Sequence, residues 1–281
     1  MNYLEAINYG SKILKLSNSN SFKLDSELLL AKALNSSREN LLVNLNKKIK
    51  KKNFNYFKTY LNRRRKNEPI AYIFKQKEFW KNSFRVSRDV LIPRPETEQI
   101  VEEVLELTNV YSSKKFLDIG TGSGCIILSI LKERPKCFGT ALDISKKALK
   151  IANFNAKMHH LQNKIKFINI DIDKFNMNNY DFILSNPPYI NEIDLKRLDK
   201  DVRLYEPLIA LKAGVDGLSE IKKIILKSKK LLKINGKLIF EIGYNQINNV
   251  AKLLNENGYY INKVCRDIQS YPRVVVSTKK S

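Results

Sequence analysis

From residue 113 to the C-terminus, short apolar segments alternate with helical ones, and this alternation constrains the fold more than any other feature of the sequence. The apolar segments have the length and composition of strands and cover residues 116–119, 138–143, 166–170, 180–185, 237–242, 259–264 and 274–278. Helical patterns lie between them, at residues 123–132, 145–156, 218–234 and 246–257. Such alternation predicts an α/β fold, with an open, mostly parallel sheet and helices on both faces.

The first 77 residues have a different pattern. Apolar residues recur near helical spacing in residues 4–16, 25–34 and 54–61, without strand-like alternation, and Ser37 has the position of a helix N-cap. A small helical domain is therefore expected over residues 1–77. Residues 78–95 read as a hairpin and a linker stiffened by its prolines, and residues 96–281 form the second domain.

Composition limits the class of protein further. Hydrophobic residues make up 43% of the 281 residues and charged residues 28%, which are globular values. No run of 18 apolar residues occurs, and the N-terminus lacks the layout of a signal peptide, so we expect a cytoplasmic protein without a membrane segment. The three cysteines form no C-x-x-C pair and there are two histidines, so neither a disulfide framework nor a metal site is expected.

The formal net charge is +23, and the first 85 residues carry 19 Lys and Arg against 6 Asp and Glu. A basic surface attracts polyanions, so the first domain could contact nucleic acid or the ribosome non-specifically, for example through the lysine-rich run at residues 47–52. The alternative is compositional drift, because the whole chain is rich in Lys, Asn and Ile. Charge alone names no partner.

A glycine-rich loop follows the first strand of the second domain. Its sequence, Asp118 to Gly124, has G-x-G-x-G spacing, which differs from the dinucleotide fingerprint and lacks the lysine of a P-loop. Glycines at this position allow a ligand to approach the backbone. The Asp118 carboxylate disfavours a pyrophosphate but suits a cationic amino-acid group. A tight turn without a ligand is the alternative.

Asp143 ends the next strand, 19 residues after Gly124. An acidic side chain at this position can accept hydrogen bonds from a ribose diol, although it could also cap the helix that starts near Ser145. Together the loop and Asp143 favour an adenosine ligand without phosphates, S-adenosylmethionine rather than NAD.

The tetrapeptide Asn186-Pro187-Pro188-Tyr189 directly follows the strand at residues 180–185. Its prolines fix the backbone and remove two amide donors. The side-chain oxygen of Asn186 and the carbonyl of Pro187 are then available to an incoming NH2 group, and Tyr189 can cover a planar group. The arrangement suits a planar amino or amide nitrogen held against an electrophile.

With these motifs the sequence resembles the PrmC/HemK family of glutamine N5-methyltransferases, which modify peptide chain release factors. The resemblance covers nearly the whole chain. Besides the glycine loop and Asn186 motif it rests on residues 68–72, 78–80, 91–98, 201–207, 214–218 and 240–243. The Asn-Pro-Pro-Tyr motif is shared with adenine-N6 methyltransferases, whereas Pro93–Glu98 and Tyr205–Pro207 are more discriminating.

The resemblance implies a Rossmann-like class I S-adenosylmethionine-dependent methyltransferase sheet, preceded by a helical domain that binds the release factor. The implied reaction methylates the side-chain amide nitrogen of glutamine in the factor's Gly-Gly-Gln motif, which modulates translation termination, with no metal. We expect a monomer. The implied cofactor residues are Asp118, Gly120, Thr121, Gly122, Ser123, Gly124, Asp143, Asp171, Ile172 and Asn186. The implied substrate-binding residues are Asn186, Pro187, Pro188, Tyr189, Arg94 and Glu206, of which Asn186, Pro187 and Tyr189 are catalytic. Asp171 ends the third strand, where the family contacts adenine, but it could equally be a strand-end cap.

Three departures from the family pattern and two rival functions stay open. Asn67 and Lys75 stand where the family has glycines, and residues 270–273 replace a more usual Gly-x-Asp-Arg near the C-terminus. These positions lie outside the catalytic loop. An adenine-N6 methyltransferase is the nearest rival, but no separate base-reading domain follows, and such enzymes must extrude the base. The other rival is a basic nucleic-acid-binding module without catalysis, which the intact motifs argue against.

Overall fold

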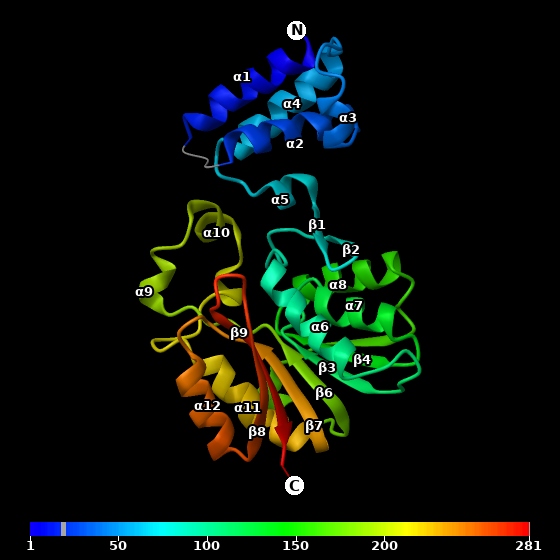
Figure 1. The fold of residues 1–281 in the computed structure, drawn as a ribbon, viewed down its shortest axis with the longest axis vertical. Helices are drawn as coiled ribbons and strands as arrows, with labels where there is room; N and C mark the ends of the chain where they lie inside the picture. Colours follow the sequence, from blue (N-terminus) through cyan, green and yellow to red (C-terminus); the bar gives the residue numbers. More distant parts are fainter. Residues whose placement is uncertain (18–20, 281) are drawn as a thin grey trace. The chain divides into compact units, whose positions relative to one another are not determined.

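The computed structural model describes residues 1–17 and 21–280. The chain divides into two compact units, whose helices and strands are labelled in Figure 1. The helical unit comprises Met1–Lys75 and Asp199–Tyr205, and the second unit, called the larger unit below, comprises Gln76–Leu198 and Glu206–Ser281. Within the described residues, no helix is long and apolar enough to cross a membrane.

The larger unit contains a seven-stranded sheet in the order β5-β4-β3-β6-β7-β9-β8. Its strands are β3 (Lys115–Ile119), β4 (Phe138–Asp143), β5 (Ile165–Asn169), β6 (Tyr180–Ser185), β7 (Leu232–Glu241), β8 (Tyr259–Arg266) and β9 (Pro272–Lys279). Strands β3 to β7 are mutually parallel, and β9 pairs antiparallel with both β7 and β8. The expected α/β fold with a mostly parallel sheet is confirmed.

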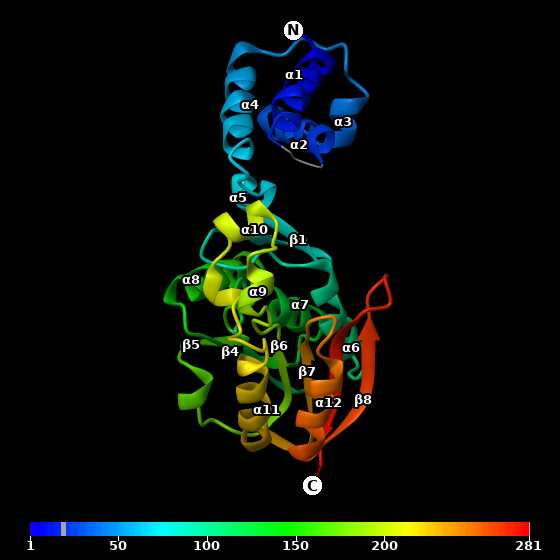
Figure 2. The same cartoon turned by 90° about the vertical axis from the view of Figure 1, so that its left-hand side faces the viewer.

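Helices cover both faces of this sheet, as Figures 1 and 2 show. One apolar cluster gathers side chains of α6 (Glu98–Glu106), α7 (Cys125–Glu133) and α8 (Lys146–Met158). The other gathers side chains of α11 (Ser219–Leu231) and α12 (Ile247–Glu256). Successive strand residues alternate between the clusters, with Phe116 in the first and Leu117 in the second, so β3 is buried on both faces.

The expected helix over residues 218–234 is three residues too long. Helix α11 ends at Leu231, and β7 begins at Leu232. Asn235 has a φ of 62° and is followed by Gly236, and the pairing of β6 with β7 shifts register between Tyr180 and Phe182. A left-handed residue followed by glycine does not continue a helix, so the last apolar residues of the pattern enter the strand.

Shorter elements complete the larger unit. The expected hairpin is present as β1 (Gln76–Phe79) and β2 (Asn82–Arg85), with its turn at Trp80 and Lys81. The other elements are η1 (Pro95–Thr97), η2 (Ile172–Lys174), α9 (Glu192–Leu195) and η3 (Leu208–Ala210).

The helical unit packs α1 (Tyr3–Lys15), α2 (Phe22–Leu34) and α4 (Lys51–Arg64) around one apolar core, with the short α3 (Arg38–Leu42) and α5 (Ile70–Phe74) beside them. The helices approach closely at Gly10, where an added Cβ would lie 2.7 Å from the Phe57 ring. The Ser37 side chain accepts a hydrogen bond from the Asn40 amide, which confirms the expected N-cap of α3.

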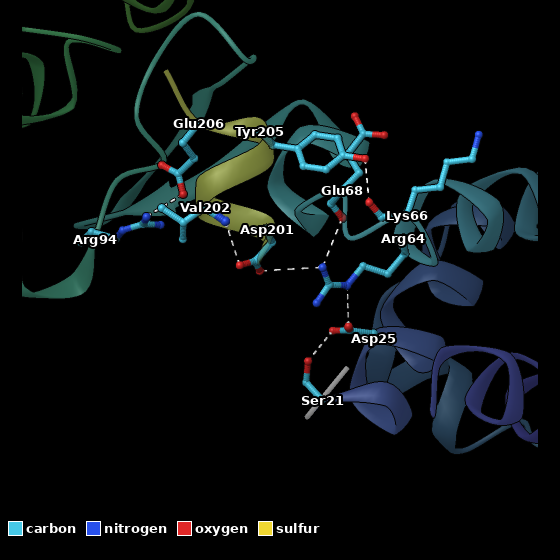
Figure 3. A network of polar contacts seen from close by, with 10 residues as sticks. All are labelled: Ser21, Asp25, Arg64, Lys66, Glu68, Arg94, Asp201, Val202, Tyr205 and Glu206. Atoms are coloured by element: carbon cyan, nitrogen blue, oxygen red, sulfur yellow. Dashed lines mark hydrogen bonds and ion pairs between the residues drawn. The ribbon is translucent and has the colours of Figure 1, made fainter. Parts of the chain in front are cut away.

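A segment distant in sequence completes the helical unit. Helix α10 (Lys200–Tyr205) belongs to it, although the expected division placed these residues in the second domain. Arg64 forms an ion pair with Asp25 at 2.7 Å and approaches Asp201 at 3.8 Å (Figure 3). The Tyr205 hydroxyl donates to the Lys66 carbonyl at 2.8 Å. Side chains spread along the chain thus meet at the end of α4.

The three departures from glycine coincide with left-handed backbone. Asn67, Lys75 and Ser270 have φ values of 64°, 57° and 65°. The conformation that favours glycine is therefore retained, although each of these residues carries a Cβ.

Candidate active site

A cleft of about 270 Å³ lies in the larger unit, at the carboxyl ends of the parallel strands. This is the edge at which open α/β sheets bind ligands. The cleft is lined by the expected residues Gly120, Thr121, Gly122, Ser123, Asp143, Asp171, Ile172, Asn186, Pro187 and Pro188. The expected residues Asp118, Gly124, Tyr189, Arg94 and Glu206 do not line it but lie in the same unit.

The loop after β3 turns through three glycines in the left-handed region. Gly120 and Gly122 have φ values of 70° and 55°, and a Cβ added to either would meet nothing closer than 4.0 Å. A Cβ at Gly124 would instead lie 3.0 Å from a Leu128 methyl group and 3.3 Å from Ala152. The first two glycines therefore leave open space beside the cleft, whereas the third allows α7 to pack against α8.

Asp118 is a fully buried carboxyl group beneath this loop. Its Oδ2 accepts a hydrogen bond from the Thr121 hydroxyl at 2.6 Å, while its Oδ1 has no hydrogen-bond partner among the described residues. Burial, reinforced by the charge of Asp143, raises the pKa of Asp118 to about 7. A buried carboxyl oxygen without a partner is suited to a donor or cation brought by a ligand.

Backbone amides orient the Asp143 carboxylate at the end of β4. Its Oδ2 accepts from the Gly122 amide at 2.9 Å and its Oδ1 from the Ser145 amide at 2.8 Å. Burial raises the pKa of Asp143, and these two bonds oppose the rise. The carboxylate therefore holds the glycine loop and lines the cleft. The N-cap of α8 is Ser145, whose side chain accepts from the Ala148 amide, so Asp143 is not the helix cap, and its contact with a ribose stays a prediction.

Asp171 follows β5 and accepts the Asp173 amide at 2.8 Å, which caps η2. It also lines the cleft beside Ile172. The cap is thus present, and a contact with adenine stays a prediction.

Asn186 projects from the end of β6, with its Nδ2 donating to the Thr97 hydroxyl at 2.9 Å. Among the described residues, no hydrogen bond reaches the Asn186 Oδ1 or the Pro187 carbonyl. The Tyr189 hydroxyl donates to Glu241 at 3.0 Å, and its ring packs against the α11 and α12 side of the core. A role of Tyr189 in covering a planar group stays a prediction. Nearby negative charge on Glu241, together with burial, raises the pKa of Tyr189.

Two residues next to this loop received no role from the sequence. Thr97 of η1 and Glu241 at the end of β7 are both buried, and the Thr97 hydroxyl donates to Glu241 at 2.5 Å. The sequence signal that could have identified Glu241 is its position, since it is a carboxylate directly after the apolar strand residues Leu238–Phe240. Its proximity to the Asn186 loop could be found only from the strand order, because β6 and β7 are neighbours and Ser185 pairs with Phe240.

Arg94 and Glu206 form an ion pair with each other, with 2.6 Å between Nη2 and Oε1 (Figure 3). Glu206 is buried and also accepts the Ile92 amide at 3.1 Å. Leu91 and Pro93 line the cleft on one side of this pair, and Pro207 and Ile209 line it on the other. The pair thus joins two segments of the cleft wall, and a direct contact of either side chain with substrate stays a prediction.

Solved structures with the same fold are methyltransferases. A ribosomal protein L11 methylase from Lactobacillus delbrueckii subsp. bulgaricus matches 73% of this chain and 90% of its own, with a TM-score of 0.52 and 20% identity. A methyltransferase from Pyrococcus furiosus matches 70% of this chain and 89% of its own, with a TM-score of 0.53 and 16% identity. The fold is that of the class I S-adenosylmethionine-dependent methyltransferases.

Sequence comparison narrows this class to one family. The PrmC N-terminal domain family matches residues 5–74, and the methyltransferase small domain family matches residues 97–202. Release factor glutamine methyltransferases from Clostridium acetobutylicum and Coxiella burnetii are 35% and 40% identical to the chain, over 99% and 92% of both partners. The chain belongs to the release factor glutamine methyltransferase family, which confirms the resemblance seen in the sequence.

Some relatives are longer. A bifunctional methyltransferase from Rickettsia prowazekii is 38% identical over 90% of this chain, but the match covers 52% of that relative. The chain thus spans about half the length of such relatives.

Proposed function

We propose that this protein transfers a methyl group from S-adenosylmethionine to the side-chain amide nitrogen of the glutamine in the Gly-Gly-Gln motif of peptide chain release factors. The observation that carries the proposal is the Asn186-Pro187 loop, whose two oxygen acceptors have no partner among the described residues and which lines the cleft. Family membership supports the acceptor. We further propose that the helical unit holds the release factor and that the protein acts as a cytoplasmic monomer.

The residues of the cleft fit S-adenosylmethionine. The buried Oδ1 of Asp118 has no partner within the described part of the chain and suits the ammonium of the methionine portion. The open space at Gly120 and Gly122 suits the close approach of that portion to the backbone. The oriented carboxylate of Asp143 can accept the two ribose hydroxyls. When bound, this cofactor supplies an electrophilic methyl group on its sulfonium sulfur.

The chain's own contribution to the reaction is positioning. An amide nitrogen is a poor nucleophile because its lone pair is delocalised into the carbonyl. If Asn186 Oδ1 and the Pro187 carbonyl accept its two N–H bonds, the nitrogen is held in one orientation and positive charge developing on it is stabilised. The nitrogen gains the methyl group and loses one proton to solvent after transfer, so no protein base is required.

The test is transfer of labelled methyl from S-adenosylmethionine to unmodified release factor and, in parallel, to duplex DNA. We expect label on the glutamine of the Gly-Gly-Gln motif, mapped by peptide mass spectrometry. A factor with that glutamine replaced by alanine is the matched control and should stay unlabelled. Label on adenine would contradict the proposal and assign the same loop to base methylation.

The cofactor site has its own test. Asp143→Ala should weaken calorimetric binding of S-adenosylmethionine by about tenfold or more, because it removes hydrogen bonds to a charged group. Asp143→Asn retains one acceptor oxygen and should lose less. Equal affinity of the alanine variant and the wild type would remove Asp143 from the site.

A further inference from the structure

The Glu241 carboxylate accepts hydrogen bonds from two hydroxyl groups, one of which, that of Thr97, also contacts Asn186. One carboxylate oxygen accepts from Thr97 at 2.5 Å and the other accepts from Tyr189 at 3.0 Å. Glu241 is 2% exposed, so these hydroxyls, rather than solvent, satisfy it. Burial raises the pKa of Glu241, and the two hydroxyl donors oppose this rise by favouring the ionised form. In its ionised form Glu241 acts as an acceptor only.

Because Glu241 is the acceptor, it determines which atom donates in the hydrogen bond between Thr97 and Asn186. A threonine hydroxyl has one proton, and Thr97 gives it to Glu241. The Thr97 oxygen can then only accept from Asn186, 2.9 Å away. The atom of Asn186 that faces Thr97 must accordingly be the nitrogen. The reversed amide would place two oxygens together without a proton between them.

Three elements that are far apart in the sequence build this chain of contacts. Thr97 lies in η1, Asn186 follows β6, and Glu241 ends β7. Ser185 pairs with Phe240, so Asn186 and Glu241 leave neighbouring parallel strands at the same edge. All three residues belong to the larger unit, and Thr97 and Asn186 both line the cleft.

We propose that Thr97 and Glu241 are positioning residues that fix the amide orientation of Asn186, so that the cleft presents its Oδ1 to the incoming group. The inference rests on the proposed function and deepens it. With the amide fixed in this way, Asn186 Oδ1 and the Pro187 carbonyl both act as acceptors, and they match an acceptor substrate that carries N–H bonds. A carboxylate or a bare carbonyl would meet two oxygens. Selection for an amide nitrogen thus depends on a carboxylate that does not touch the substrate.

Thr97→Val tests this role, because valine has nearly the same shape but no hydroxyl. We expect kcat for release factor methylation to fall at least tenfold, while the calorimetric affinity for S-adenosylmethionine stays within twofold. Thr97→Ser keeps the hydroxyl and should stay within threefold of the wild-type kcat. Thr108→Val is the matched control, since Thr108 is buried beyond the opposite end of α6 and should affect stability without lowering kcat. A kcat for Thr97→Val within twofold of wild type, or an equal loss in Thr97→Ser, would overturn the proposal.

Coupling to Asn186 separates positioning from packing. Because Thr97 acts through Asn186, adding Thr97→Val to Asn186→Ala should lower kcat by less than a further twofold. Glu241→Leu removes the carboxylate that accepts the Thr97 hydrogen bond, and it should lower kcat by about as much as Thr97→Val does. In the Thr97→Val, Glu241→Leu double variant the two losses should not multiply. Independent, multiplying losses would contradict the proposed chain of contacts.

A spectroscopic measurement tests the inference without turnover. The side-chain NH2 signal of Asn186, assigned by its absence in Asn186→Ala, should shift in Thr97→Val and remain in place in Thr97→Ser. An unchanged signal in Thr97→Val would overturn the inference. If wild-type protein methylates no glutamine, the proposed function fails, and this signal still decides whether Thr97 orients Asn186.

Discussion

Backbone positions with a positive φ carry glycine where they border the cleft of the larger unit, but asparagine or lysine at the helix ends of the helical unit. Gly120 and Gly122 leave space that a Cβ would occupy beside the ligand site. In the helical unit Asn35 and Lys75 end α2 and α5 in the same left-handed region. At Gly120 and Gly122 glycine leaves open space beside the cleft, whereas Asn35 and Lys75 adopt the same backbone region with a side chain present.

The two units also differ in the sequence separation of the residues that build their main features. The cofactor loop of the larger unit is continuous in sequence from Asp118 to Gly124. The helical unit depends instead on Arg64, which reaches Asp25 across 39 residues and Asp201 from a different part of the chain. We therefore expect single substitutions in the larger unit to lower activity and single substitutions in the helical unit to lower stability.

Asn186→Ala should have the largest effect. Turnover should fall by a factor of at least about 10², which is the typical cost of one preorganised polar contact. Thermal unfolding and calorimetric cofactor affinity should change little, because the loop backbone is held by Pro187 and Pro188. Steady-state kinetics with release factor measure the effect. Near-normal turnover would remove Asn186 from the acceptor site.

Arg64→Ala should have the corresponding effect on stability. The variant removes the ion pair between Arg64 and the buried Asp25 carboxylate, drawn in Figure 3, and should lose roughly 2 kcal/mol of the free energy of unfolding. Trp80 is the single tryptophan and lies in the larger unit, so its fluorescence reports that unit, while circular dichroism reports both. We expect urea unfolding to shift by circular dichroism and not by fluorescence.

Lys222→Ala provides the contrast, since it removes an exposed ion pair with Asp216 and should cost at most about 0.5 kcal/mol. Equal shifts in the fluorescence and dichroism of Arg64→Ala would show that the units unfold together and would remove the distinction between them.

The features that could be predicted from the sequence are those that depend on residues close together along the chain. All seven strands of the large sheet were expected from apolar segments bounded by turn residues, and Asp143 and Asn186 line the cleft because the carboxyl ends of parallel strands share an edge. The pairing of Arg94 with Glu206 joins residues 112 positions apart, and the Thr97–Glu241 contact depends on which strands are neighbours. No periodicity or motif encodes such pairings, because they depend on strand order and the packing of η1.

Asp118 should make both the free energy of unfolding and the cofactor affinity depend on pH. Its usual pKa is 3.8, and burial raises it to about 7 in the folded protein. Between these values the folded chain holds the proton more tightly, so the free energy of unfolding should fall as pH rises from about 4 to about 7 and then level off. A cofactor ammonium requires the ionised carboxylate, so cofactor affinity should fall about tenfold per pH unit below pH 7. Calorimetry and urea unfolding across this range should show both slopes, and Asp118→Asn should flatten both. Slopes that persist in Asp118→Asn belong to another group.

Lys75→Gly tests the comparison between glycine and other residues at positive φ. Lysine pays roughly 1 kcal/mol or more for its left-handed backbone, whereas glycine adopts it freely but gains entropy in the unfolded chain. The net result should be a stabilisation of roughly 0.5 kcal/mol, seen by circular dichroism during urea unfolding. Asn67→Gly is the matched control at a φ of 64°, and it should change stability less because asparagine tolerates this region. A destabilised Lys75→Gly would mean that the lysine side chain contributes more by its contacts than it costs by its backbone, and the difference between the units would then reflect packing rather than ligand space.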